Sequence, residues 1–254
     1  MLEQATIKAP GRTIGYLTGG SGPLIVLIAS TGRSGNDFIE LADLLIEQGF
    51  SVALPDARGI GESDGKWDGI SFYDLADDVA QVIGAHGQEA TVAGHAYGAW
   101  IARATAQAYP ERANGVALIA AGAGQWPSHL SGAIDVLCGT DTSRDEKLAA
   151  LKTAFFAPGN DPQDWLNGWY PPVVSAQRAA RINTDENWKR SGTAPILDLL
   201  ALDDPFRPAD SRNFYRDLLG ERVTIQTIDA ASHALPHERP QAVARALTDW
   251  IRSL

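Results

Sequence analysis

Cysteine is almost absent from this sequence, because Cys138 is its only cysteine. A single thiol can neither close a disulfide within the chain nor supply a cysteine-based zinc site, so both are excluded, and we expect a reducing, cytoplasmic setting. The sequence also lacks an uncharged apolar run approaching the roughly 20 residues that a membrane helix needs. Its first residues show no basic segment followed by an apolar one, so we expect no signal peptide and no membrane partner.

Positive charge is scarce as well, with 21 Lys and Arg residues against 31 Asp and Glu residues and a formal net charge of -10. Such a chain repels nucleic acid, so we expect no nucleic-acid partner. No G-x-G-x-x-G segment follows a strand and opens a helix, so no dinucleotide cofactor is predicted. The histidines show no metal-ligand spacing, and we therefore expect neither a cofactor nor a metal.

Hydrophobic residues are abundant, at 44% of 254 residues, which allows one large α/β domain with an insertion. Continuous apolar runs such as Leu24 to Ala29 are typical of strands buried on both faces of a parallel sheet, and they alternate with segments of helical spacing. The pattern predicts a doubly wound, mostly parallel sheet of about eight strands. The expected strands are 5–8, 13–17, 24–29, 50–54, 90–93, 116–120, 195–200 and 223–228, and the expected helices are 37–48, 72–83, 100–109, 212–219 and 240–254.

This alternation stops after Gly124 and resumes near residue 191, which predicts a core of residues 1–124 and 191–254 and a helical cap of residues 125–190. The cap segment is rich in aromatic residues. Together they predict an apolar, partly aromatic pocket for a small apolar or aromatic substrate. The residues chosen as its lining are Trp126, Trp165, Trp169 and Tyr170.

The strongest local motif is Gly94-His95-Ala96-Tyr97-Gly98, which lies between a predicted strand and a predicted helix. In a G-x-S-x-G nucleophile elbow the central residue occupies a strained strand-to-helix turn, and the small residues on either side allow the backbone to make that turn. The nucleophile then lies at a helix N-terminus, where developing negative charge is favoured. Here the motif holds alanine at its centre, and an alanine side chain cannot attack a substrate.

Four segments in order give the chain a resemblance to the α/β-hydrolase superfamily along nearly its whole length. Asp56 to Ser63 resembles the D-x-R-G-x-G-x-S loop, Gly94 to Gly98 the elbow, and Leu202 to Pro205 the loop that carries the acid. Ser232-His233 with Glu238-Arg239-Pro240 resembles the segment of the catalytic histidine. One such motif is weak, but four in this order imply the α/β-hydrolase fold.

The resemblance implies a Ser-His-Asp layout with Ala96 at the nucleophile position. His233 would be the general base and Asp204 the residue that orients it. The backbone N–H groups of Thr31 and Tyr97 would form the oxyanion hole.

Other residues near these positions are harder to assign. Asp203 is the alternative to Asp204. Ala29-Ser30 stands where the family has His-Gly after the third strand, and Arg33 follows in the same loop, so we expect Ser30 and Arg33 to contact substrate. Asp56 is interpreted as a structural loop acid, and Asp198 lies inside an apolar strand with no partner that the sequence reveals.

Three interpretations of Ala96 stay open. It is either an engineered replacement of serine, or a natural residue in an enzyme where His233 and Asp204 activate water or a substrate proton, or the trace of a lost activity with binding retained. The segments Phe155 to Asp161 and Trp169 to Pro171 are similar to a bacterial branch of the superfamily in which alanine occurs natively. The leading hypothesis is a cofactor-independent hydrolase for an ester, lactone or related acyl compound, that is, an esterase or lactonase. The alternatives are a non-serine dyad enzyme, such as a lyase or C–C bond-cleaving catalyst, and a ligand-binding pseudoenzyme, and the oligomeric state stays open between monomer and homodimer.

Overall fold

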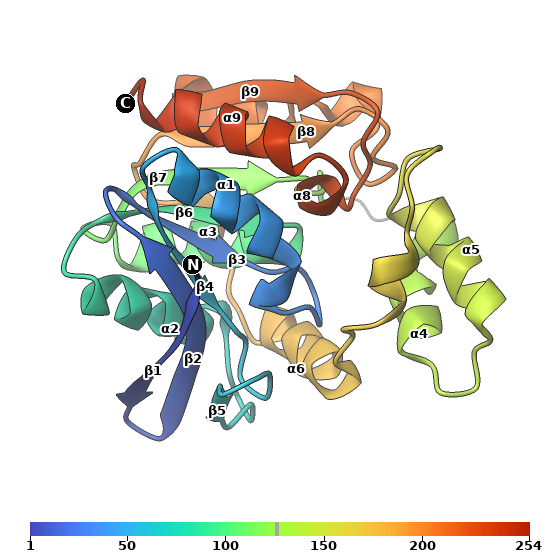
Figure 1. Ribbon diagram of the computed structural model, residues 1–254, viewed down its shortest axis with the longest axis horizontal. Coiled ribbons are helices and arrows are strands. Elements are labelled where there is room, and N and C mark those ends of the chain that lie inside the picture. The colour runs from blue at the N-terminus through green and yellow to red at the C-terminus, as the bar shows by residue number, and fades with distance from the viewer. Residues whose placement is uncertain (125–126) are drawn as a thin grey trace.

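A single twisted sheet forms the centre of the computed structural model, which describes residues 1–124 and 127–254 (Figure 1). The nine strands of its described part follow the order β1-β2-β4-β3-β6-β7-β8-β9, and β5 pairs with β2. The pairs along the path β4-β3-β6-β7-β8-β9 are all parallel, whereas β2 pairs antiparallel with β1, β4 and β5. The strands are β1 (Glu3–Ala9), β2 (Arg12–Gly20), β3 (Leu24–Ile28), β4 (Ser51–Pro55), β5 (Asp64–Gly65), β6 (Ala90–His95), β7 (Ala113–Ile119), β8 (Ile196–Ala201) and β9 (Val223–Ile228).

The predicted α/β-hydrolase fold with a mostly parallel, doubly wound sheet is therefore confirmed. The central strands β3, β4, β6 and β8 are buried along their whole length, as their continuous apolar sequences predict. The sheet has one strand more than expected. The additional strand, β5, is only two residues long and has no periodicity from which it could be predicted.

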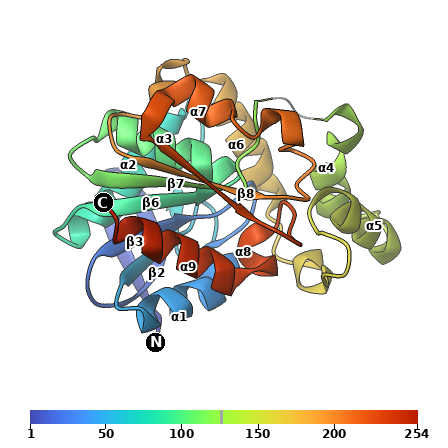
Figure 2. The ribbon, with the colours of Figure 1, turned by 90° about the horizontal axis from the view of Figure 1, so that it is seen from above.

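Helices cover both faces of the sheet, and Figure 2 shows the two layers on either side of it. Helix α9 (Pro240–Ile251) shows why the helices pack against the sheet: Val243, Leu247 and Trp250 lie on one face of this helix and are part of the hydrophobic core. One face carries α1 (Ile39–Glu47) and α9 (Pro240–Ile251), and the other carries α2 (Phe72–Ala85), α3 (Tyr97–Ala108) and α7 (Phe214–Leu219). Short helical turns complete the core: η1 (Gly35–Phe38), η5 (Ala209–Ser211), η6 (Gly220–Arg222) and α8 (Leu235–Glu238).

A helical insertion separates β7 from β8, and in its described part no strand is present. Helices α4 and α5 lie at one end of the molecule, whereas α6 returns beside the sheet (Figure 1). The elements of the insertion are η2 (Ser128–Leu130), α4 (Ala133–Cys138), α5 (Arg144–Ala154), η3 (Gln163–Leu166), α6 (Pro171–Ile182) and η4 (Asn187–Arg190). Within the described residues, no helix has the length and apolarity to cross a lipid bilayer.

Candidate active site

The elbow motif makes an abrupt connection between β6 and α3. Ala96 has φ 49° and ψ -107°, a conformation that side-chain-bearing residues rarely adopt, and its N–H donates to Ile119 O at 3.0 Å. A Cβ on Gly94 would lie 2.1 Å from the Gly98 carbonyl, and one on Gly98 would lie 2.2 Å from Ile28 O. Both glycines are therefore required by close backbone contacts, and the strained turn exists although its central side chain is only a methyl group.

His233 and Asp204 meet as the sequence predicts. The Nδ1–H of His233 donates to Asp204 Oδ2 at 2.9 Å, and both residues are 3% exposed. The second carboxylate oxygen, Oδ1, accepts the Phe206 N–H at 2.8 Å, and the Phe206 ring lies edge-on to the imidazole with centroids 4.4 Å apart. Because Nδ1 is occupied by the carboxylate, Nε2 is the histidine atom left to exchange a proton.

Asp203, the alternative acid, does not face His233. Its side chain is exposed. Its main chain bonds to the loop of the histidine instead, with its N–H donating to Ala231 O at 3.0 Å and its carbonyl accepting the Ser232 hydroxyl at 3.1 Å. Asp203 thus joins the two loops, and Asp204 is the residue that contacts the imidazole.

The loop that carries Asp204 is anchored by a buried ion pair that explains Asp198. Arg207 Nη2 lies 2.5 Å from Asp198 Oδ2, and the two side chains are 1% and 0% exposed. Burial raises the pKa of Asp198 to about 6, although the Arg207 guanidinium acts in the opposite direction. Arg207 also donates to Ala121 O at 2.7 Å, which ties the acid loop to the segment after β7.

The loop that carries His233 is held from two sides. The His95 Nε2–H donates to the His233 carbonyl at 2.6 Å, and complete burial lowers the pKa of His95 to about 3. Glu238 accepts the Ser232 N–H at 2.7 Å and the Ala157 N–H at 2.7 Å. His95 therefore packs and bonds beneath the elbow, as its position in the motif indicates.

A cavity of about 130 Å³ lies over the elbow and brings six of the predicted residues together. Two of them, Thr31 and Tyr97, have backbone N–H groups without an acceptor among the described residues, and the neighbouring Gly32 N–H is already bound to Gln177 Oε1. The Tyr97 N–H is free because Tyr97 is the first residue of α3. The predicted residues at this cavity are Ser30, Thr31, Ala96, Tyr97, Trp169 and His233.

Three predicted substrate contacts lie elsewhere. Arg33 is 4% exposed, forms a bidentate pair with Asp37 at 2.8 and 2.6 Å, and donates to Asn167 O at 2.6 Å. Trp165 is 2% exposed and packs in a cluster formed mainly by the insertion, and Tyr170 is the N-cap residue of α6, with its N–H bonded to Gly32 O. Arg33 and the Tyr170 main chain thus bond the insertion to the loop after β3, whereas Trp165 contributes by packing, and its buried Nε1–H has no acceptor among the described residues. Trp126 lies outside the described residues.

The cavity is also lined by residues that the sequence does not mark as site residues. Trp100 follows Ala96 by four positions, so helical spacing alone places it on the face of α3 that begins at the elbow. Phe155 belongs to a segment that carries the family resemblance, and its ring lies 5.8 Å from that of His233. Only the three-dimensional structure places the remaining lining residues, which are Gly122, Gly124, Ile134 and Phe206.

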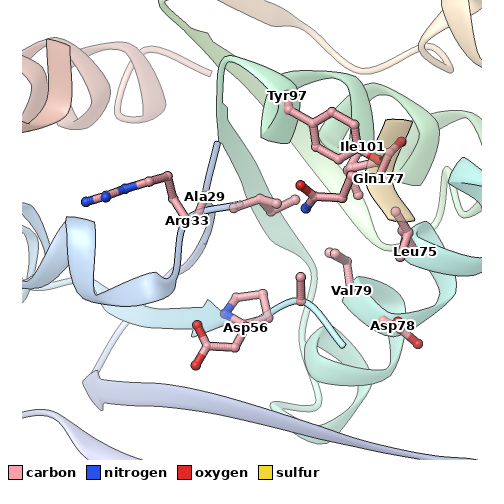
Figure 3. Close-up of a pocket in the computed structure, with 12 residues that line it drawn as sticks. Ala29, Arg33, Asp56, Leu75, Asp78, Val79, Tyr97, Ile101 and Gln177 are labelled. Carbon is pink, nitrogen blue, oxygen red and sulfur yellow. Dashed lines mark hydrogen bonds between the residues drawn. The ribbon is translucent and has the colours of Figure 1, made fainter. Parts of the chain in front are cut away.

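A second, smaller cavity of about 50 Å³ lies between β3, β4, α2 and α3 (Figure 3). Asp56 borders it, but its Oδ1 accepts the Gly35 N–H at 2.8 Å, which fits the interpretation of a structural loop acid. Burial is the largest cause of the raised pKa of Asp56. Figure 3 shows the Arg33 guanidinium extending away from Leu75, Val79 and Ile101.

Within the described residues, no cluster of three or more His, Cys, Asp or Glu side chains could hold a metal ion.

Comparisons with known proteins agree with this architecture. Residues 25–246 match the alpha/beta hydrolase family. A soluble epoxide hydrolase from Corynebacterium sp. (strain C12) is 33% identical over 101 residues, which are 39% of this chain and 34% of that protein, so the match spans about a third of the relative.

Two solved structures share the fold over almost the whole chain. A thermophilic esterase from Thermogutta terrifontis has a TM-score of 0.80 at 20% identity, over 99% of this chain and 98% of the other. A hydrolase from Pseudomonas aeruginosa PA01 has a TM-score of 0.79 at 20% identity, over 98% of both chains. Because the family match spans most of its length, the chain belongs to the alpha/beta hydrolase family.

Proposed function

We propose that the protein hydrolyses an ester or lactone with a water molecule that His233 activates and Asp204 helps to orient. One observation carries the proposal: a buried, carboxylate-paired histidine and two free backbone N–H groups surround the same cavity as Ala96. This arrangement supplies a base and an anion-binding site but no side-chain nucleophile. Water is the nucleophile that remains.

The reaction begins when Nε2 of neutral His233 takes a proton from water while the oxygen attacks the carbonyl carbon. The carbonyl oxygen becomes an oxyanion, which the N–H groups of Thr31 and Tyr97 stabilise. The tetrahedral intermediate then collapses, the bond to the leaving oxygen breaks, and the imidazolium donates its proton to that oxygen. The products are a carboxylic acid and an alcohol, or a hydroxy acid from a lactone, and Asp204 stabilises the imidazolium while it exists.

The size of the cavity supports direct attack by water. Its volume of about 130 Å³ is well above the roughly 10–15 Å³ that one water molecule needs, so a substrate acyl group and water both fit. The methyl group of Ala96 occupies less space than a serine hydroxymethyl group would. Trp100, Phe155 and Trp169 provide an apolar wall, which favours a small apolar or aromatic acyl group. In this proposal the insertion, residues 125–190, acts as the cap that excludes bulk solvent.

The test is a side-by-side assay of chromogenic esters and lactones with this chain, Ala96→Ser and His233→Ala. We expect turnover by the alanine form, a loss of about 10²–10⁴-fold in His233→Ala, and no requirement for serine. A burst of acyl-enzyme only in Ala96→Ser, with no turnover by the alanine form, would overturn water activation. An epoxide belongs in the panel because the 33% identical relative is named an epoxide hydrolase.

Isotope labelling distinguishes hydrolysis from the other use of the same pair, abstraction of a substrate proton in a lyase or C–C bond-cleaving reaction. In H₂¹⁸O under single-turnover conditions, hydrolysis by water places one ¹⁸O in the acid product. A product free of ¹⁸O would assign His233 to proton abstraction. Saturable binding of the panel without any product would instead indicate a ligand-binding protein.

A further inference from the structure

Another recess, of about 340 Å³, has lining residues in common with the cavity over Ala96. We call it the Trp188 groove. It shares Trp100, Gly122 and Gly124 with the cavity over Ala96, so these three residues form a common wall between the two spaces. Its lining is Trp100, Arg103, Gly122, Gly124, Arg181, Trp188, Lys189, Phe214, Tyr215 and Leu218.

The charges around the Trp188 groove are unusual for this protein. Three cationic side chains line it, Arg103, Arg181 and Lys189, and no acidic side chain does, although the chain carries a net charge of -10. Arg181 and Lys189 share one carboxylate, that of Glu186, which lies 3.2 Å from Arg181 and is 62% exposed. The groove therefore keeps an excess of positive charge beside aromatic rings.

Arg103 adds a buried charge that has hydrogen-bond acceptors but no carboxylate in contact with it. Its Nε donates to Ser191 Oγ at 2.7 Å and its Nη2 to Lys189 O at 2.6 Å, and both acceptors are uncharged. Arg103 is 2% exposed, and among the described residues no carboxylate lies within 4.0 Å of it. Its guanidinium lies 4.8 Å from the Trp188 ring and 5.0 Å from that of Tyr215, whose other neighbour is Arg207 at 4.8 Å. The charged groups around the Tyr215 ring are therefore Arg103, Arg207 and Asp198. This cluster holds two arginines but only one carboxylate, so it has one positive charge in excess.

Trp188 provides a further unsatisfied group. Its indole Nε1–H is buried and has no acceptor within the part of the chain that the structure describes. A buried donor without a partner costs about 1–3 kcal/mol, and a desolvated cation without an anion costs more. An anion in the groove would pair with the excess cation.

We propose that the Trp188 groove binds the carboxylate of the substrate, so that the enzyme acts on esters or lactones that carry a free carboxylate on an aromatic body. This inference rests on the proposed function and specifies its substrate class. The reacting carbonyl lies in the cavity over Ala96, the aromatic body lies along Trp100, and the carboxylate faces Arg103, Arg181 and Lys189. Arginine suits this role because its planar guanidinium matches carboxylate geometry.

Two matched comparisons test the groove. Binding of 1-naphthoate and of neutral 1-naphthamide is measured by calorimetry, independently of turnover. Values of kcat/KM are then compared for 4-acetoxybenzoate and neutral 4-acetoxybenzamide. For both pairs we expect at least a tenfold preference for the carboxylate, reduced by increased salt.

The variants are chosen to remain folded, because they change partly exposed side chains. Arg181→Gln should reduce the carboxylate preference about threefold to tenfold, and Glu186→Gln should increase it by releasing Arg181 and Lys189. Arg178→Gln is the control, because it removes the same charge one turn earlier on α6, at a position that pairs with Asp135 and lines a different recess beside the cavity rather than the groove. Unchanged preference in Arg181→Gln, or an equal effect of Arg178→Gln, overturns the inference.

The two proposals fail differently. Turnover of both acetoxy compounds without a carboxylate preference would leave the hydrolase function in place and remove the groove as a carboxylate site. Tight 1-naphthoate binding that depends on Arg181, without turnover of any ester, would support the anion site and remove the hydrolase function.

Discussion

Removing either partner of the buried ion pair beneath the acid loop should destabilise the protein, and the two removals should differ in size. Arg207→Met leaves Asp198 under the electrostatic influence of Arg103, whereas Asp198→Leu leaves the buried guanidinium groups of Arg207 and Arg103 without a carboxylate. Breaking a buried pair costs about 3–5 kcal/mol, and Arg207→Met also strips the Ala121 carbonyl of its donor. We therefore expect Arg207→Met to cost about 4 kcal/mol, and Asp198→Leu to cost more.

The assay is equilibrium unfolding in urea with thermal melts as a check, since about 4 kcal/mol corresponds to a fall in Tm of roughly 8–16 °C in a chain of this size. The double variant, Asp198→Leu with Arg207→Met, removes both charges and should recover at least about 2 kcal/mol relative to Asp198→Leu alone. Equal effects of the two single changes, or full additivity in the double variant, would refute the account of a cluster with one excess positive charge.

Three further predictions concern the elbow and the insertion. His95→Phe leaves the buried His233 carbonyl without its donor and should lower kcat with little change in KM; it should also remove a pH dependence of stability. The pKa of His95 is about 3 in the folded protein, below its ordinary value of 6.5, so between these pH values the unfolded chain binds one more proton than the folded chain. The contribution of neutral His95 to stability is therefore lost as the pH falls from about 6.5 to about 3. Identical pH profiles of unfolding for the original protein and His95→Phe would contradict this assignment. Gly98→Ala forces a Cβ to within 2.2 Å of Ile28 O and should abolish turnover or folding, whereas a fully active Gly98→Ala enzyme would refute the close-contact argument. Arg33→Ala, which removes the contacts to the insertion, should increase protease cleavage of residues 160–170 and raise KM, and an unchanged cleavage pattern would show that Arg33 does not hold this segment.

The fold and the central dyad could be predicted because their signals are local or lie in order along the chain. Continuous apolar strands predict the parallel sheet, and four short motifs place Asp204 and His233. Helix α3 begins at Tyr97 rather than at the expected residue 100, because the elbow turns directly into the helix and leaves no loop.

The insertion was harder to predict because aromatic residues serve both packing and substrate contact there. Of the described aromatic candidates in it, Trp169 lines the cavity, whereas Trp165 and Tyr170 do not. Nothing local in the sequence distinguishes them. The partner of Asp198 was equally hidden, although Arg207 lies only nine residues later, because the guanidinium reaches back to the strand from a loop of irregular backbone.

Arg33 and Gln177 have a consequence for how new substrate ranges could arise in this scaffold. The segment from residue 165 to residue 177 is bonded through them to the same short loop that presents the Thr31 N–H. Replacing that segment would disturb the placement of the carbonyl oxygen along with the shape of the cavity. Helices α4 and α5 carry no such bond, although Ile134 of α4 lines the cavity. Variation between residues 128 and 154 is therefore where selection, or a library of designed variants, can change which molecules are accepted while the chemistry stays intact.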